Sequence, residues 1–318
     1  MVGQVYKSTG SWYEVKTAEG KLYSCRIKGK FRLAGIKSTN PIAVGDWVEF
    51  ELQEEETEES GVIHVIQERK NYIIRKSVNL SKQVHIIASN LDQVFLMVTY
   101  NNPTTYPRFI DRFLVTAEAY DIPVVLLFNK MDTYSGEDWE EWQFLIHTYR
   151  TIGYHCMEIS ALEQTGLEEI RELMMDKVSM FAGNSGVGKS TLVNALQPGL
   201  NLKTREITEQ HAQGQHTTTF AEMYDLDFGA RIIDTPGIKG FGVVDMEKEE
   251  IGDYFPEFFR LKSECKFNNC LHLDEPKCAV KDALDQGELF WSRYRSYVQL
   301  LEGEEDSYRL DPFSENEN

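Results

Sequence analysis

Apolar and polar residues alternate along short stretches near the start of the chain, and glycines separate these stretches. Alternation with a period of two predicts β-strands that bury one face. Such strands are expected at residues 12–15, 21–27, 46–50 and 62–66. Short strands at this spacing predict a small β-barrel, for which an OB-fold is one candidate. An SH3-like barrel or a plain structural cap would show the same periodicity and stays open.

The pattern changes near residue 92, where continuous apolar runs replace the alternation. These runs predict buried strands at residues 93–99, 123–128, 179–182 and 231–233. Helical periodicity lies between them, at residues 108–120, 139–152 and 189–196. Strands that alternate with helices predict a parallel sheet covered on both faces. After about residue 245 the chain becomes helical, aromatic and rich in Cys and His.

These patterns divide the chain into three expected domains. We expect an OB-fold barrel over 1–70, an α/β domain over 71–245, and a mostly helical domain over 246–318 that ends in an acidic tail. A length of 318 residues fits two or three domains at about 100–200 residues each. The first residues lack the apolar run of a signal peptide, and no stretch approaches about eighteen apolar residues. We therefore expect a cytoplasmic protein, monomeric and without membrane contact.

The net charge of −18 by itself argues against a nucleic-acid partner, because contacts to phosphates need cations. The distribution of charge weakens that argument. Residues 1–45 hold eight Lys and Arg against two acids, whereas acids gather at 54–59 and in the tail. Acidic runs of this kind are typical of solvated loops, and residues 54–59 are expected at the tip of a hairpin.

A glycine-rich stretch at residues 183–190, GNSGVGKS, matches the phosphate-loop pattern G-x-x-x-x-G-K-[S/T]. It follows an expected strand and opens an expected helix, as this loop requires. Backbone N–H groups of such a loop wrap phosphates, and the helix N-terminus attracts their charge. Lys189 is then expected to reach the β- and γ-phosphates, and Ser190 to ligate Mg²⁺.

The run NKMD at residues 129–132 predicts the base of the nucleotide. It follows an expected strand, at the edge of a parallel sheet where ligands bind. The Asp132 carboxylate can accept hydrogen bonds from N1–H and the 2-amino group of guanine, whereas adenine would leave this carboxylate unpaired. The stem of Lys130 can lie over the base. Beside the phosphate loop, this run predicts GTP and GDP as ligands.

Two shorter runs fit the same site. The EISA run at 158–161 is similar to a loop that supports guanine through a Ser and an Ala, here Ser160 and Ala161. The DTPG run at 234–237 fits a D-x-x-G loop. In such a loop, Asp234 would hold the magnesium shell, and the N–H of Gly237 would sense the γ-phosphate.

The hydroxyl-rich stretch GQHTTT at 214–219 is expected to act as a switch loop. One threonine should complete the magnesium shell, and we favour Thr218 with Thr217 as the alternative. Position 238 is isoleucine, where many GTPases carry a glutamine that orients water. Isoleucine cannot polarise water, so intrinsic turnover should be slow, and His216 is the nearest candidate replacement. An exposed loop histidine without a catalytic role is the alternative.

The motifs occur in an inverted order. Ordinary GTPases place the phosphate loop first, whereas here N-K-x-D and the Ser-Ala run precede it. This order is a circular permutation, which a sheet tolerates because it can form with its termini moved. The chain consequently leaves the D-x-x-G loop and enters the C-terminal domain directly. Displacement of the γ-phosphate sensor can then move that domain.

Three cysteines and one histidine lie within fourteen residues near the C-terminus, namely Cys265, Cys270, His272 and Cys278. Three thiolates and one imidazole meet the demand of tetrahedral Zn²⁺, and a site closed by four protein ligands is structural, not catalytic. The alternative is a set of reduced cysteines in a small helical domain. The two remaining cysteines are expected in hydrophobic cores.

Together these residues resemble the ribosome small-subunit-dependent GTPase A family (RsgA, also called YjeQ), a circularly permuted bacterial GTPase. The segments that carry the resemblance are residues 10–15, 41–48, 88–94 and 181–190 and the spacing of the Cys/His cluster. The resemblance implies a late assembly factor of the small ribosomal subunit. It also implies that the OB and zinc domains grip ribosomal RNA, that the subunit stimulates GTP hydrolysis to drive release, and that His216 is catalytic.

Two other classes of function are open at this point. A P-loop enzyme could transfer phosphate from GTP to a metabolite, although no acceptor site is evident in the sequence. An RNA-binding scaffold with a vestigial GTPase is disfavoured by the intact Lys189, Ser190, Asp234 and Asp132. The predicted catalytic residues are His216 and Lys189, with Mg²⁺ on Ser190 and Thr218. The predicted nucleotide-binding residues are Asn129, Lys130, Met131, Asp132, Ser160, Ala161, Gly183, Asn184, Ser185, Gly186, Val187, Gly188, Lys189, Ser190, Thr191, Asp234 and Gly237.

Overall fold

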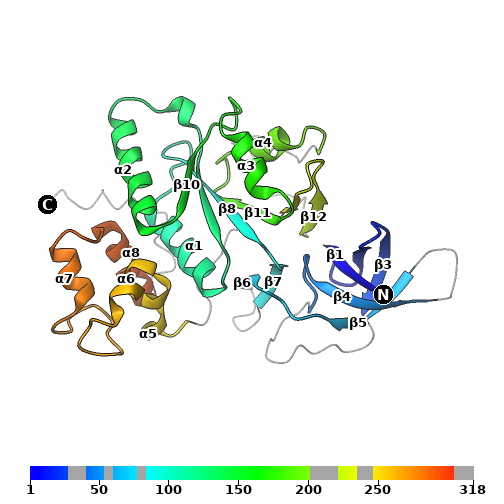
Figure 1. Cartoon of the computed structure of the whole chain (residues 1–318), viewed down its shortest axis with the longest axis horizontal. Coiled ribbons are helices and arrows are strands. Elements are labelled where there is room, and N and C mark those ends of the chain that lie inside the picture. The colour runs from blue at the N-terminus through cyan, green and yellow to red at the C-terminus, as the bar shows by residue number, and fades with distance from the viewer. Residues whose placement is uncertain (28–40, 54–59, 77–83, 201–220, 235–245, 304–318) are drawn as a thin grey trace, which may run out of the picture.

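The structure is a computed structural model that describes residues 1–27, 41–53, 60–76, 84–200, 221–234 and 246–303. Three parts follow one another along the chain: a β-barrel, an α/β domain and a helical lobe (Figure 1). The α/β domain lies between the other two, so both contact the domain that carries the phosphate loop (Figure 1). This arrangement confirms the predicted fold class.

The N-terminal part is a closed barrel of five strands: β1 (Val2–Ser8), β2 (Tyr13–Thr17), β3 (Leu22–Ile27), β4 (Trp47–Leu52) and β5 (Ser60–Ile66). The strand order is β1-β2-β3-β5-β4, and β4 pairs again with β1 to close the barrel. Only the β3–β5 pair is parallel. This order is that of an OB-type barrel. The sequence pattern missed β1, and the expected hairpin tip at 54–59 lies outside the described residues.

A two-stranded hairpin, β6 (Tyr72–Lys76) and β7 (Val84–Ser89), leads from the barrel to the α/β domain. The buried Asp46, which precedes β4, fastens the barrel to this hairpin. Its carboxylate accepts two hydrogen bonds from the Arg69 guanidinium and one from the Ser89 hydroxyl, all at 2.6 Å. Because the ion pair is buried and fully hydrogen-bonded, it fixes this junction geometrically.

The central sheet consists of β8 (Gln93–Val98), β9 (Val124–Phe128), β10 (His155–Glu158), β11 (Val178–Gly183), β12 (Glu222–Asp225) and β13 (Arg231–Asp234). Its order is β10-β9-β8-β11-β13-β12, and only β12 runs antiparallel to its neighbours. Strand β12 also pairs with β1, so the barrel and the sheet share one run of hydrogen-bonded strands.

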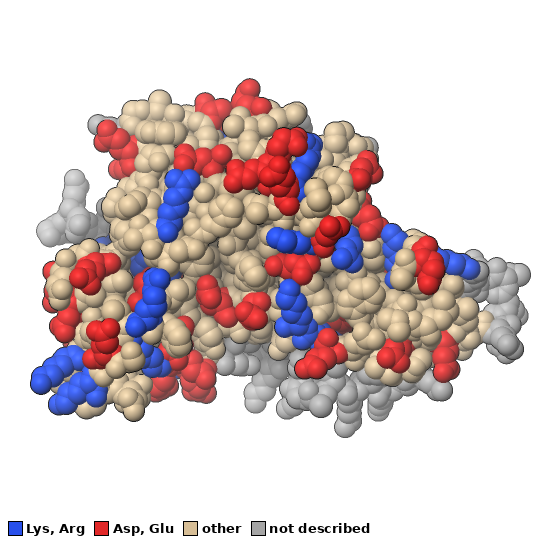
Figure 2. Space-filling model, viewed as in Figure 1, with Lys and Arg blue, Asp and Glu red and all other residues tan. Residues whose placement is uncertain are grey.

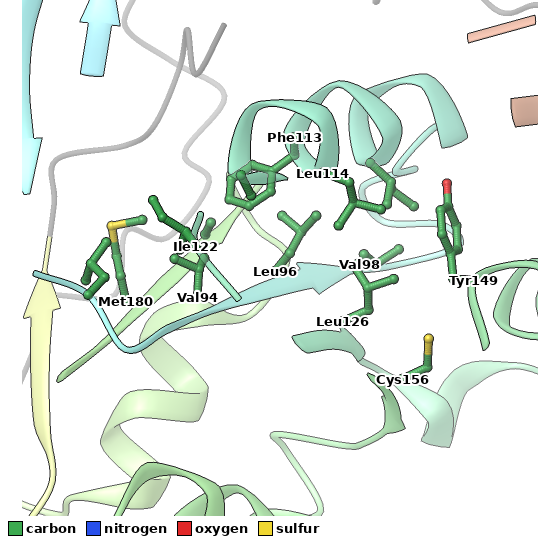
Figure 3. Packing of buried hydrophobic residues seen from close by; sticks show 14 of the residues in the cluster. Val94, Leu96, Val98, Phe113, Leu114, Ile122, Leu126, Tyr149, Cys156 and Met180 are labelled. Carbon is green, nitrogen blue, oxygen red and sulfur yellow. The ribbon is translucent and has the colours of Figure 1, made fainter. Parts of the chain in front are cut away.

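Helices cover both faces of this sheet: α1 (Pro107–Ala119) and α2 (Glu137–Ile152) on one, α3 (Leu167–Met174) and α4 (Lys189–Leu196) on the other. Strand β8 is apolar from Val94 to Val98 because both of its faces are covered. Val94, Leu96 and Val98 belong to the core beneath α1 (Figure 3), whereas Phe95 and Met97 belong to the opposite core. Since successive side chains alternate between faces, a strand covered on both sides favours a continuous apolar run over an alternating one.

The C-terminal lobe consists of α5 (Lys248–Ile251), a 3₁₀ turn at Gly252–Tyr254, α6 (Pro256–Lys262), α7 (Ala279–Asp285) and α8 (Trp291–Glu302). A buried ion network joins this lobe to the α/β domain. Arg293 on α8 contacts Asp111 on α1 at 2.6 Å and Glu257 on α6 at 2.7 Å. The Tyr149 hydroxyl of α2 donates a hydrogen bond to Asp111 at 2.7 Å. Four helices from two domains therefore meet at one guanidinium.

None of the helices within the described ranges combines the length and the apolar character that crossing a bilayer requires.

Candidate nucleotide site and metal centre

The separated sequence motifs meet at one edge of the central sheet. Asn129 follows β9, the phosphate loop follows β11, and Asp234 is the last residue of β13. Strands β9, β8, β11 and β13 are parallel, so their carboxyl ends lie along the same edge. Ligands of parallel sheets bind at this edge. The inverted order in the sequence thus leaves the spatial arrangement of the motifs intact.

Glycines allow the phosphate loop to lie close to its neighbours. Gly188 has φ of 107°, and a Cβ atom there would lie 2.4 Å from Nδ2 of Asn129. Gly183 has φ of 137°, and its Cβ would lie 2.5 Å from the carbonyl oxygen of Met97. At both positions, the positive φ and the short distance mean that any residue with a Cβ atom would be strained, whereas glycine is not. A larger residue at either position would push the loop away from β8 or from the NKMD run.

Lys189 begins α4 and points back over the loop. Its Nζ donates hydrogen bonds to the carbonyl oxygens of Gly183 and Asn184, both at 2.8 Å. Burial lowers the pKa of Lys189 to about 8, while the charge of Asp234 acts in the opposite direction. The ammonium group is therefore held over the phosphate loop by two of its carbonyl oxygens, at the N-terminus of α4, where an anion is favoured.

Asn129 connects three of the predicted motifs through its side chain. Its Nδ2 donates to the carbonyl oxygen of Val187 in the phosphate loop at 2.8 Å. Its Oδ1 accepts from the backbone N–H of Ala161 at 2.9 Å. The amide is buried, so each contact replaces a hydrogen bond to water that is no longer available. Asn129 therefore fixes the Ser-Ala run and the phosphate loop to the end of β9.

Hydrogen bonds hold the other residues of the NKMD run in place and leave Asp132 exposed. The Ser160 hydroxyl donates to Oδ1 of Asp132 at 2.5 Å, and the backbone N–H of Met131 donates to the carbonyl oxygen of Ile159 at 3.2 Å. Lys130 adopts a left-handed conformation with φ of 68° and donates to the carbonyl oxygen of Asn102. Burial lowers the pKa of Lys130. Asp132 is exposed, so its carboxylate is available to a ligand.

One supporting residue was not predicted from the sequence. The Tyr134 hydroxyl donates to the carbonyl oxygen of Asn129 at 3.2 Å and accepts from the backbone N–H of Tyr100 at the same distance. Tyr134 thereby holds the end of β9 from behind. A tyrosine five residues after the asparagine has no recognisable motif, so no sequence signal marks it.

Several predicted residues are placed near the phosphate loop, and others lie outside the described residues. Ser190 and Thr191 follow Lys189 in the first turn of α4, with Ser190 half-buried and Thr191 exposed. The predicted switch and sensor residues, His216, Thr217, Thr218, Gly237 and Ile238, all fall in the ranges 201–220 and 235–245.

The C-terminal Cys/His cluster forms a compact, buried group. The ligand atoms of Cys265, Cys270, His272 and Cys278 all lie within 4.8 Å of one another. Nδ1 of His272 lies 3.3 Å from Sγ of Cys278 and 3.7 Å from Sγ of Cys265. Ligand atoms around a tetrahedral Zn²⁺ are about 3.5–3.8 Å apart, given bonds of about 2.0–2.3 Å. The geometry therefore fits a metal with Nδ1, not Nε2, as the histidine ligand.

Burial by itself favours the neutral forms of the thiols and the imidazole in this cluster. Burial raises the pKa of Cys270 to about 12 and raises the pKa of Cys278. Burial lowers the pKa of His272. Because thiolates are the metal-binding form, a divalent cation would supply the charge that makes them stable here.

The loop that carries His272 is fixed by polar contacts. The Tyr297 hydroxyl donates to the carbonyl oxygen of Leu271, and the Tyr294 hydroxyl donates to that of His272, both at 2.7 Å. The Glu275 carboxylate accepts from the backbone N–H of Leu271 at 2.8 Å. Such contacts orient metal ligands before binding. None of these three side chains was predicted, because their roles depend on contacts to backbone carbonyls and N–H groups.

A phosphate loop and an NKMD run converging on one sheet edge in inverted order define a circularly permuted P-loop GTPase. A family model described as the RsgA GTPase matches residues 66–244, and one described as the RsgA N-terminal domain matches residues 2–63. The chain belongs to the RsgA GTPase family.

Individual relatives match along nearly the whole chain. A protein of Christiangramia forsetii named small ribosomal subunit biogenesis GTPase RsgA is 66% identical, over 98% of this chain and 99% of the relative. Its namesake in Flavobacterium johnsoniae is 64% identical, over 99% of this chain and 97% of the relative. The crystal structure of YjeQ from Thermotoga maritima shares 37% identity with a TM-score of 0.77, covering 95% of this chain and 97% of that one. YloQ, described as a circularly permuted GTPase, shares 32% identity with a TM-score of 0.72, covering 95% of this chain and 94% of that one.

Proposed function

We propose that the chain hydrolyses GTP to GDP and phosphate as a late factor in biogenesis of the small ribosomal subunit. The barrel and the metal-binding lobe bind the subunit and its ribosomal RNA, the subunit stimulates hydrolysis, and GDP formation releases the protein. GTP as the substrate is supported above all by the contacts of Asn129. Its side chain fastens the phosphate loop and the Ser-Ala run to the NKMD run at the end of β9. The names of the relatives support the ribosomal part.

The nucleotide occupies the carboxyl edge of the sheet. Asp132 accepts hydrogen bonds from the guanine, and Ser160 holds that carboxylate in place. Lys189 exchanges its contacts to loop carbonyl oxygens for the β- and γ-phosphates. Mg²⁺ is held by Ser190 and, through its shell, by Asp234. The remaining proposed contacts come from the backbone of 183–191 and from Asn129, Lys130, Met131, Ala161 and Gly237.

Hydrolysis depends on residues of the switch loop. His216 orients the attacking water, since Ile238 cannot, and Thr218 completes the magnesium shell. Intrinsic turnover is slow because the isoleucine at position 238 cannot polarise the attacking water. The ordering of switch loops by a partner is a general route to stimulated hydrolysis.

The metal of the C-terminal lobe is one structural Zn²⁺ per chain. Three thiolates and one imidazole leave no open coordination position, which suits a folding role. Residues 1–70, 71–245 and 246–318 are the proposed domains. We further infer a cytoplasmic monomer, in keeping with a ribosomal partner.

Nucleotide-dependent association tests this function. Purified small subunits are sedimented with the protein in the presence of a non-hydrolysable GTP analogue or of GDP. Co-sedimentation with the analogue and its loss with GDP are expected, and the Asp132→Asn variant should lose the response to the analogue. Equal binding in both nucleotide states would contradict release by hydrolysis.

A further inference from the structure

The barrel meets the GTPase sheet where β1 pairs with β12. Lys7 of β1 is the antiparallel partner of Glu222, and Glu222 is in turn the antiparallel partner of Asp234 on β13. Partners in an antiparallel pair project to the same face of a sheet. Lys7, Glu222 and Asp234 therefore form a row across three adjacent strands, from the barrel to the end of β13.

Charge along this row reaches the proposed magnesium loop. Nζ of Lys7 lies 3.3 Å from Oε2 of Glu222, and about one third of each side chain is exposed. Tyr224 lies two residues after Glu222 on β12 and therefore on the same face of the sheet. Its pKa is raised first by burial, then by Glu222 and by the charge of Asp234. The charges of Glu222 and Asp234 thus both act on Tyr224. Lys7, which belongs to the barrel, brings a positive charge to the same place.

Other polar contacts hold this joint from the opposite face of β12. Asp225 accepts from Lys16 of β2 at 2.5 Å and from the Tyr6 hydroxyl of β1 at 2.8 Å. Arg231 of β13 donates to Oε1 of Gln4 on β1 at 2.6 Å. Figure 2 shows side chains of both signs along the boundary between barrel and sheet. The joint is therefore polar on both faces, and the charge of the row can be changed while these contacts remain.

We propose that Lys7 and Glu222 are positioning residues for Asp234, because they set the electrostatic potential in which Asp234 holds the magnesium shell. Glu222 adds negative charge beside Asp234, and Lys7 offsets it from the barrel. An anionic partner that binds Lys7 would expose the charge of Glu222 and favour Mg²⁺ at the nucleotide site. Docking of the barrel on such a partner would then strengthen Mg²⁺ binding at the site of hydrolysis. This inference rests on the proposed role of Asp234.

Single substitutions of the two partners separate an electrostatic role from a structural one. The readout is the Mg²⁺ concentration that gives half-maximal binding of a non-hydrolysable GTP analogue, compared with the concentration that gives half-maximal GTP hydrolysis, both without ribosomal subunits. Glu222→Gln should raise this concentration about threefold, and Lys7→Gln should lower it about threefold, as expected for one partly screened charge near a divalent cation. Lys16→Gln, which alters the opposite face of the same joint, is the matched control and should leave it unchanged.

A charge exchange sharpens the test. Lys7→Glu combined with Glu222→Lys restores an ion pair but places a cation beside Asp234, so the Mg²⁺ requirement should exceed that of Glu222→Gln. Recovery of the wild-type value, or shifts of the two single variants in the same direction, would overturn the inference and leave a structural ion pair. The Asp234→Asn variant distinguishes failure of the proposed role of Asp234 from failure of this inference alone. If it leaves the Mg²⁺ requirement unchanged, the proposed role of Asp234 fails; if it raises the requirement while Glu222→Gln does not, only this inference fails.

Discussion

Replacing Arg293 by methionine should destabilise the attachment of the C-terminal lobe to the GTPase domain. The guanidinium is 1% exposed and contacts the carboxylates of Asp111 and Glu257, which are 0% and 5% exposed. Methionine fills a similar volume but leaves both carboxylates without their cation. Removal of one partner from a buried ion pair costs about 3–5 kcal/mol. We expect a loss of that size in the free energy of unfolding at neutral pH.

The pH dependence of the defect follows from Asp111. Burial raises the pKa of Asp111, and the charge of Arg293 lowers it, so the pKa should rise further in the variant. A carboxyl group whose pKa is higher in the folded than in the unfolded protein lowers the free energy of unfolding at neutral pH. This cost disappears as pH falls from the folded-state pKa to the unfolded-state pKa. The defect should therefore be largest at neutral pH and shrink toward acidic pH.

Urea unfolding of the zinc-loaded protein, followed by circular dichroism, measures this effect. Arg295→Met is the matched control, since Arg295 is exposed two residues further along α8. Its effect should stay within about 0.5 kcal/mol, as for surface substitutions generally. If Arg293→Met costs no more than this control, or if its defect grows toward acidic pH, the assigned role of the buried network is refuted.

Three further predictions concern the ligands. Asp132→Asn should weaken GTP binding by about 100-fold or more and favour xanthosine triphosphate, because two hydrogen bonds to a charged acceptor are lost; unchanged selectivity in competition binding would remove Asp132 from the site. With a pKa of about 8 for Lys189, GTP affinity should fall about tenfold between pH 7 and pH 9, with proton uptake on binding measurable by calorimetry in two buffers; a flat profile would contradict the assignment. Elemental analysis should find one zinc per chain, lost in Cys270→Ser together with thermal stability but kept in Cys156→Ser; a metal-free protein of wild-type stability would refute the site.

The sheet that carries the site could be predicted from the sequence because its strands leave strong signals. Strand β9 is apolar at every position and β8 is apolar from Val94 to Val98, since helices cover both faces of the sheet. The phosphate loop and the NKMD run each follow such a strand. Once the strands are known to be parallel, the motifs must meet at one edge, whatever their order along the chain. The predicted Cys/His cluster likewise needed only its spacing.

The joint between barrel and sheet left no comparable signal. Strand β12 has four residues, two of them acidic, and it is stabilised by main-chain pairing on both sides. Strand β1 was missed because its polar residues alternate imperfectly where a register shift occurs between Val5 and Lys7. Short strands of this kind form through neighbours that are distant in the sequence, so local patterns cannot indicate them.

Arg293 shows the same limit for side chains. In the sequence it lies in a polar stretch of α8, two positions before another arginine, and nothing distinguishes the two. Its burial depends on Asp111, which lies 182 positions earlier in the chain. Tertiary packing alone decides which of two similar charges is buried, and a buried charge requires a partner.

Stimulated turnover tests the central claim most directly. GTP hydrolysis is measured with and without purified small ribosomal subunits, for the wild-type protein, for His216→Ala and for His211→Ala as the control. We predict that subunits raise the turnover number of the wild type and of His211→Ala by at least about tenfold, a low value for a partner-stimulated GTPase. His216→Ala should bind GTP normally yet remain unstimulated. Tight GTP binding with no stimulation of the wild type, or full stimulation of His216→Ala, would contradict the account.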